Sequence, residues 1–173
     1  MKVGVLGAGT WGTALARMLS NTGNDVVIWS AIEAEVEEYS RTRKHPNLPG
    51  MDIPEQIDFT ADIEKACVDK GIVLFAVPSV FVRSTAAKAA AHIDNNQIIV
   101  DVAKGIEPET LLTMTQIIEE ELVKRDKHPQ IVALSGPTHA EEVALDMPTT
   151  IVAASQNLGT AEKVQDVFMN TCM

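Results

Sequence analysis

Short apolar runs alternate with longer amphipathic stretches along the whole chain. The apolar runs are mostly uninterrupted, which is typical of strands buried on both faces of a sheet. They predict strands over residues 3–6, 26–29, 57–60, 72–77, 97–102, 131–134 and 149–154. The stretches between them predict helices over residues 10–21, 32–39, 62–68, 79–92, 108–124, 138–145 and 161–169. This alternation predicts an α/β fold with a doubly wound, mainly parallel sheet and helices on both faces.

Glycine and proline positions refine this pattern. Gly23 follows the first predicted helix and should end it, as a glycine after the last turn commonly does. Pro108 falls in the first turn of the helix predicted over 108–124, where its missing N–H is tolerated. Residues 40–56 form a proline-containing loop, and its linker-like part, residues 43–56, is too short to separate two domains. We therefore interpret residues 1–173 as one domain.

Composition and charge narrow the possible functions. The 173 residues include 24 acidic and 14 basic side chains, and 46% are hydrophobic, which is enough for a core without disulfide or metal staples. The net charge of −10 argues against a nucleic-acid partner. The two cysteines, Cys67 and Cys172, form no metal-type or disulfide pattern, so we expect no metal and a cytoplasmic location. No apolar segment suits a signal peptide or membrane insertion.

Residues 7–12, Gly-Ala-Gly-Thr-Trp-Gly, have the form G-x-G-x-x-G directly after the first strand and at the start of the first helix. In such a turn Gly7 permits a tight bend, Gly9 lets the backbone approach a pyrophosphate, and Gly12 allows close helix–strand packing. The helix start then offers unpaired N–H groups to the phosphates. The alternative is a glycine-rich turn that binds nothing. The motif's position favours a Rossmann-like dinucleotide site.

The residues after the second strand do not decide between NAD and NADP. An acidic residue expected there for the ribose of NAD is replaced by Ser30 and Ala31. Glu33 is close, but we interpret it as part of a solvated helix face. No arginine follows directly to hold the 2′-phosphate of NADP. Basic side chains come later, and we interpret them as a solvated turn: Arg41, Arg43 and Lys44.

Four further motifs make the prediction more specific. Together with GAGTWGTALA at 7–16, the chain carries LPG at 48–50, AVPS at 76–79, AKGIE at 103–107 and LSGPTHAEEV at 134–143. Their order and spacing resemble the N-terminal domain of bacterial NAD(P)-dependent glycerol-3-phosphate dehydrogenase, over essentially the whole chain. The last two motifs discriminate best, because other Rossmann dehydrogenases share the first.

This resemblance implies interconversion of sn-glycerol 3-phosphate and dihydroxyacetone phosphate, feeding glycerophospholipid synthesis, with NAD or NADP as cofactor. It implies that Lys104 touches both substrate and cofactor. The other implied substrate-binding positions are Gly136 and Thr138. The implied cofactor contacts, besides the three glycines, are Thr10, Trp11, Ala31, Phe81 and Ala140. Ala31 occupies a position that is often basic or polar in relatives. Its small apolar side chain gives no support for NADP.

The residue chemistry agrees with a role for Lys104. It follows the carboxyl end of an apolar strand, where open α/β sheets bind ligands. A cation there favours a phosphorylated substrate, or the oxygen that gains charge when hydride is transferred to a ketone. The alternative is a surface lysine before a helix.

Other candidate residues have structural alternatives. Thr138 and Glu141 form a T-x-x-E pattern that predicts a capping box, with or without substrate contact. Phe81 is either a cofactor contact or a core aromatic residue. His139 has a pKa range that suits a general acid, but we interpret it as a residue of the helix start.

The resemblance also implies a second, helical domain, because family members continue for roughly as long again. That domain carries the lysine assigned as catalytic base, and the full-length protein is expected to be a homodimer. We therefore expect this chain to lack the downstream helical domain and to bind a nicotinamide dinucleotide with little turnover, since half of a site cannot orient the reacting groups.

Two alternatives remain at this point. One is a related two-domain dehydrogenase of 3-hydroxy acids or ketopantoate, which residues 103–105 and 135–138 disfavour. The other is a non-catalytic module that senses NAD(H). Such a sensor needs a partner-binding or DNA-binding element, and the sequence contains no basic helix–turn–helix.

Overall fold

The apolar runs become the strands of one seven-stranded sheet in a computed structural model that describes residues 1–172. The strands are β1 (Lys2–Leu6), β2 (Asp25–Trp29), β3 (Asp58–Thr60), β4 (Ile72–Phe75), β5 (Ile98–Asp101), β6 (Gln130–Ser135) and β7 (Val152–Ser155). The helices are α1 (Thr10–Asn21), α2 (Glu33–Thr42), α3 (Ile63–Cys67), α4 (Ser79–Ala89), α5 (Met114–Val123), α6 (Ala140–Ala144) and α7 (Leu158–Phe168).

The strand order is β3-β2-β1-β4-β5-β6-β7, and every pairing is parallel except that of β6 with β7. The predicted doubly wound, mainly parallel sheet is therefore confirmed. The chain moves outward from β1 to β3 and then returns to place β4 on the other side of β1. Open sheets bind ligands at such a reversal, outside the carboxyl ends of the strands.

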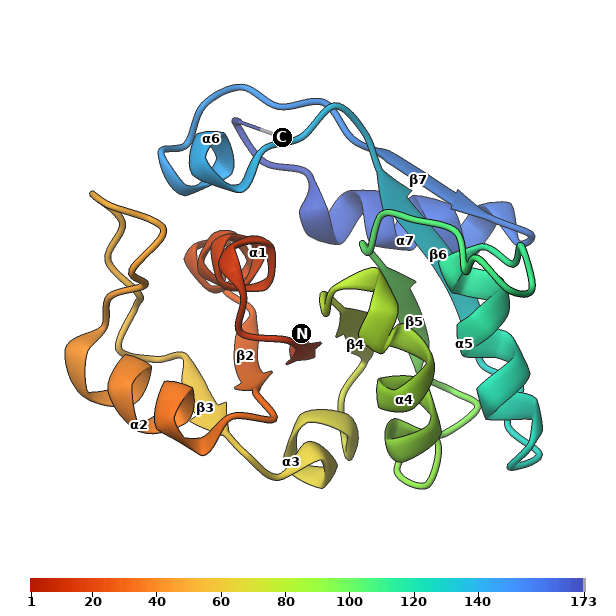
Figure 1. Cartoon of the computed structure of the whole chain (residues 1–173). Helices are drawn as coiled ribbons and strands as arrows, with labels where there is room; N and C mark the ends of the chain where they lie inside the picture. Colours follow the sequence, from red (N-terminus) through yellow and green to blue (C-terminus); the bar gives the residue numbers. More distant parts are fainter. Residues whose placement is uncertain (173) are drawn as a thin grey trace.

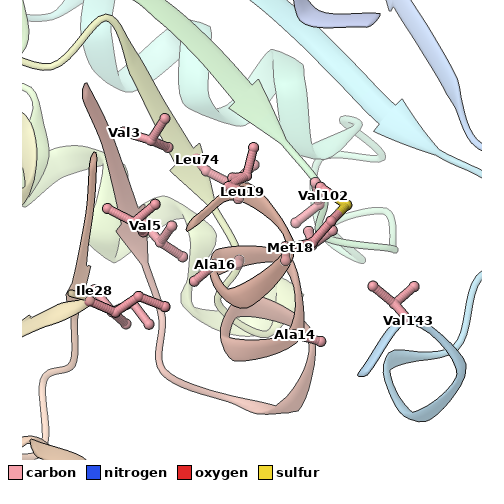
Figure 2. Close-up of a cluster of buried hydrophobic side chains, with 14 of the residues drawn as sticks. Val3, Val5, Ala14, Ala16, Met18, Leu19, Ile28, Leu74, Val102 and Val143 are labelled. Carbon is pink, nitrogen blue, oxygen red and sulfur yellow. The ribbon is translucent and has the colours of Figure 1, made fainter. Parts of the chain in front are cut away.

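Helices cover both faces of the sheet, and each face has its own apolar core. Helices α1, α6 and α7 pack on one face, and α3, α4 and α5 pack on the other (Figure 1). Figure 2 shows the first core, where Ala16 and Leu19 of α1 lie close to Val5 and Leu74 of the central strands. This packing holds α1 across β1 and so sets the direction of its N-terminus.

Local signals in the sequence were right at one helix end and wrong at another. Gly23 adopts a φ of +85° just after α1, as predicted. The helix predicted over 108–124 begins only at Met114, because Leu111 has a φ of +59° and residues 106 and 113 pair across the preceding turn. The N–H of Thr113 donates to Gln116 Oε1 over 2.9 Å and closes the true helix start. Pro108 therefore lies in a turn.

The last helix also starts earlier than predicted. The Asn157 side chain accepts a hydrogen bond from the Thr160 N–H over 3.0 Å, so α7 begins at Leu158 rather than at residue 161. Within residues 1–172, no helix has the length and apolar character needed to cross a membrane.

Candidate functional site

A cleft of about 390 Å³ lies at the carboxyl edge of the sheet, where the strand order reverses. Four segments line it: residues 9–11 after β1, 76–79 after β4, 102–104 after β5 and 138–141 after β6. A groove of about 480 Å³ between α5 and β6–β7 contains none of the predicted site residues. The cleft at the carboxyl edge of the sheet is therefore the candidate site.

The glycine turn at residues 7–12 forms one wall of this cleft. Gly7 has a φ of +124°, and a Cβ there would lie 2.7 Å from the Ala76 carbonyl oxygen. A Cβ on Gly12 would lie 2.1 Å from the Gly7 oxygen. These two glycines let the turn, α1 and β4 pack closely, as the sequence pattern predicts.

Gly9 differs from the other two glycines because a Cβ there would meet no atom within 4 Å. It is the N-cap of α1, no side chain caps that helix, and the first turn contains no acidic residue. The first N–H groups of a helix have no intrahelical partner. Together with the positive end of the helix dipole, they suit an anionic group such as a pyrophosphate.

Trp11 forms part of the cleft wall and also packs against the core. Its Nε1–H is buried without a hydrogen-bond partner among residues 1–172. A buried donor left unpaired costs free energy. This buried nitrogen is not exposed to the cleft, so the open position at Gly9 is the feature that fits a dinucleotide.

Lys104 lies on another wall of the same cleft. Its Nζ donates to the Gly136 carbonyl oxygen over 3.1 Å, and to the carbonyl and hydroxyl oxygens of Thr138 over 3.3 and 3.2 Å. All three acceptors are uncharged, and no carboxylate in the described part of the chain pairs with this ammonium. Its charge is therefore available to an anionic ligand.

The predicted capping box at Thr138 is wrong. Helix α6 has His139 as its N-cap, and no side chain caps it. The Thr138 hydroxyl instead contacts Lys104, because Thr138 lies one residue too early for the cap and is turned toward the β5 end. His139 itself lines the cleft.

The segment that carries Lys104 is held on both sides. On one side the Asp101 carboxylate accepts the Ala103 N–H over 3.0 Å, and burial raises the pKa of this carboxyl to about 7. On the other side Glu107 pairs with Arg83 over 2.6 Å. Hydrogen bonds from Arg83 and then Thr110 lower the Glu107 pKa to about 2. These contacts restrict the loop and so define where the Lys104 side chain can reach.

The remaining predicted positions divide into three groups: in the cleft lining, behind it and outside it. Thr10 and Ala140 line the cleft. Gly136 lies behind it, where its backbone packs against residues 150 and 151 and its carbonyl accepts from Lys104. Ala31 and Phe81 are exposed outside the cleft, and Phe81, at 56% exposure, is not a core aromatic residue.

Two residues near the glycine turn escaped the sequence analysis. His45, in the loop 40–56, is 5% exposed, and its Nδ1 accepts the Asn47 N–H over 3.2 Å. Burial lowers the His45 pKa, and the nearby Ala8 carbonyl opposes this, so the loop reaches back to the glycine turn. Glu35 is hydrogen-bonded to Ser30 after β2. The sequence gave no periodic signal for either contact, because His45 lies in a loop and Glu35 lies on the polar side of a helix.

Comparison with known proteins identifies the family that the chain resembles. A family model described as NAD-dependent glycerol-3-phosphate dehydrogenase N-terminus matches residues 2–161. An NAD(P)+-dependent glycerol-3-phosphate dehydrogenase 2 of Lactobacillus delbrueckii subsp. bulgaricus is 66% identical over 174 residues, which cover 99% of this chain and 52% of the relative. The corresponding enzyme of Agathobacter rectalis is 48% identical over 170 residues, covering 98% of this chain and 49% of the relative.

A solved structure agrees as well. The crystal structure of glycerol-3-phosphate dehydrogenase from Coxiella burnetii superimposes with a TM-score of 0.90 at 26% identity, over 99% of this chain and 51% of that one. The present chain spans about half the length of the curated relatives it matches. On these grounds the chain belongs to the family of the N-terminal, NAD-binding region of NAD-dependent glycerol-3-phosphate dehydrogenases.

Proposed function

We propose that this chain is the dinucleotide-binding domain of a glycerol-3-phosphate dehydrogenase that interconverts sn-glycerol 3-phosphate and dihydroxyacetone phosphate for glycerophospholipid synthesis. One observation carries the proposal. The open helix start at Gly9 and the unneutralised ammonium of Lys104 lie on two walls of one cleft. This arrangement suits a dinucleotide and a phosphorylated substrate side by side.

The residues of the glycine turn would hold NAD or NADP, which supplies or accepts a hydride when bound. The N–H groups of the first turn of α1 would bind the pyrophosphate, with Thr10 and Trp11 beside it. Ala140 would contact the cofactor from α6. Ala31 and Phe81 lie outside the cleft, so we propose that they meet the ends of a molecule longer than the cleft itself.

Lys104 would serve the substrate. Its ammonium can bind the phosphate, or stabilise the oxygen that gains negative charge at the carbon that accepts hydride. Thr138 and the Gly136 carbonyl hold the ammonium in place through the bonds described above. Turnover by this chain alone is expected to be low, because the catalytic base is expected in the other half of the full-length protein, which we propose is a cytoplasmic homodimer.

The relatives favour this function over the alternatives. They are named as NAD(P)+-dependent glycerol-3-phosphate dehydrogenases, not as dehydrogenases of 3-hydroxy acids or ketopantoate, or as sensors. The cleft also contains a cation placed for a phosphorylated substrate, which a purely cofactor-sensing module does not need.

Calorimetric titration of this chain tests the proposal. We expect NADH to bind, and dihydroxyacetone phosphate to bind the NADH-loaded chain. Lys104→Ala should keep NADH affinity within about threefold and lose at least about tenfold in affinity for the phosphorylated ketone, as expected when a charge-assisted bond is removed. Lys88→Ala on α4, far from the cleft lining, is the matched control and should change neither affinity.

Absence of NADH binding would overturn the proposed function. Unchanged affinity of Lys104→Ala for dihydroxyacetone phosphate would remove Lys104 from the substrate site.

A further inference from the structure

The end of β2 lies directly beside the glycine turn. The Gly7 N–H donates to the Trp29 carbonyl oxygen over 2.9 Å, so Ser30 follows β2 at the same edge of the sheet. In doubly wound folds the adenosine ribose of a bound dinucleotide lies over this strand end. An acidic residue there binds the 2′-hydroxyl of NAD, whereas an arginine accommodates the 2′-phosphate of NADP. The inference below rests on the proposed dinucleotide binding.

A carboxylate is held at this strand end, although none follows β2 directly in the sequence. Ser30 is 4% exposed, and its hydroxyl donates to Glu35 Oε2 over 2.6 Å. The same hydroxyl oxygen accepts the Ile32 N–H over 3.1 Å, which fixes its direction. Glu35 Oε1 has no hydrogen-bond partner in the described part of the chain. One carboxylate oxygen is thus anchored and the other is free to accept from a hydroxyl group.

Of the three basic side chains nearby, Arg43 and Lys44 bind other groups and Arg41 lies further along the helix. Arg43 Nη1 donates to the Ile57 carbonyl oxygen over 2.7 Å, and its guanidinium lies 5.9 Å from the centre of the Phe59 ring. Lys44 pairs with Asp52. Arg41 lies six residues after Glu35 in α2, about 9 Å further along the helix axis. No ammonium or guanidinium among the described residues therefore pairs with Glu35.

Other charged groups around this carboxylate are negative or neutral. Glu33 in the first turn of α2 adds a second negative charge. His45 is buried, and this burial lowers its pKa and so disfavours its positively charged form. A 2′-phosphate placed here would meet like charge without a compensating cation.

We propose that Ser30 and Glu35 form a ribose-recognition pair that makes this chain selective for NAD(H) over NADP(H). Glu35 accepts the ribose 2′-hydroxyl, and Ser30 holds the carboxylate in position for it. Repulsion between the carboxylate and a 2′-phosphate at hydrogen-bonding range predicts that NADH binds roughly 10- to 100-fold more tightly than NADPH.

Calorimetric titrations of the chain with NADH and with NADPH test this pair. Glu35→Gln should weaken NADH binding by about threefold to tenfold and strengthen NADPH binding by about tenfold, because the charge is removed while the shape is kept. Glu37→Gln is the matched control, since it removes one charge from the same helix at an exposed position with no contact to Ser30. It should change both affinities by less than about twofold.

Ser30→Ala separates positioning from charge. This variant keeps the Glu35 carboxylate but removes the hydrogen bond that holds it in place. NADH binding should therefore weaken, while discrimination against NADPH is largely retained. Circular dichroism of each variant verifies that it is folded.

Equal affinity of the unaltered chain for NADH and NADPH would overturn the proposed role of Ser30 and Glu35 in ribose recognition. It would leave the proposed function intact. Equal shifts in Glu35→Gln and Glu37→Gln would also overturn this role, because they would indicate only the general field of the acidic helix. If neither nucleotide binds, the proposed function fails and this inference fails with it.

Discussion

Replacing Gly9 with aspartate is expected to stabilise the folded chain and at the same time to abolish dinucleotide binding. Gly9 has φ and ψ of −70° and 179°, the extended conformation usual for an N-cap residue, and a Cβ there meets no atom within 4 Å. An aspartate carboxylate can therefore accept the first free N–H groups of α1 without strain. Those are the donors that a bound pyrophosphate needs.

The two effects have different magnitudes and opposite signs. Aspartate exceeds glycine as a cap by a few tenths of a kcal/mol, and its charge at the helix start adds about 0.3–1 kcal/mol. The free energy of unfolding should rise by about 0.5–1 kcal/mol, a gain of about 1–4 °C in Tm for a chain of this size. Losing two hydrogen bonds to a charged pyrophosphate costs about 3–6 kcal/mol, which weakens binding at least about 100-fold.

Thermal unfolding without ligand and calorimetric titration with NADH measure these two effects separately. Gly9→Asn is the matched control: it has the same shape and caps the same helix, but its neutral side chain should reduce NADH affinity less. Gly12→Ala should behave oppositely in the unfolding assay, because its Cβ would lie 2.1 Å from the Gly7 oxygen. Overpacking of this kind costs about 1–3 kcal/mol.

Unchanged NADH affinity in Gly9→Asp would refute the reasoning, because the phosphates would then not lie on the start of α1. A Tm below that of the unaltered chain would refute the claim that space is open at Gly9.

Three further predictions concern the contacts around the cleft. Asp101 titrates near 3.9 when unfolded and at about 7 when folded, so the folded state holds an extra proton between these values and stability falls as pH rises through them. Asp101→Asn should escape this loss. In denaturant unfolding, the variant's free energy of unfolding relative to the unaltered chain should therefore rise by up to about 4 kcal/mol between pH 4 and pH 8. In Arg83→Met the pKa of Glu107, lowered to about 2 by that arginine, should return toward its usual value in an NMR titration. Arg17→Met removes two hydrogen bonds, of 2.8 and 2.9 Å, to the half-exposed carboxylate of Asp146. The free energy of unfolding should fall by less than about 1 kcal/mol, but amide hydrogen exchange in α6 should become faster.

Local rules predicted the parts of this protein that depend on short-range physics. Uninterrupted apolar runs predicted the buried strands, because a strand covered on both faces has no solvated side. The spacing of Gly7, Gly9 and Gly12 predicted the turn, since only glycine permits the bend at Gly7 and the close contacts at Gly7 and Gly12, while Gly9 leaves space for a ligand. Lys104 was predicted to lie at a strand end, and the structure places it there.

Local rules failed where a distant residue decided the outcome. Pro108 suggested a helix start, but contacts from Arg83 to Glu107 hold the preceding turn in another shape. Thr138 and Glu141 matched a capping box, yet the Thr138 hydroxyl bonds to Lys104 from another strand. One short-range contact was also missed: the carboxylate beside β2 was sought next to Trp29, whereas Ser30 holds the carboxylate of Glu35, five residues further on in the first turn of α2.

The sequence by itself therefore determined the alternation of elements, the class of sheet and the chemical nature of the glycine turn, because each depends on residues a few positions apart. Only the tertiary structure decided which polar groups from distant segments meet in and beside the cleft: Lys104 with Thr138, and His45 with the glycine turn. Each of these contacts depends on how strands and helices pack side by side. That packing depends on the complete core, so no window of the sequence contains it.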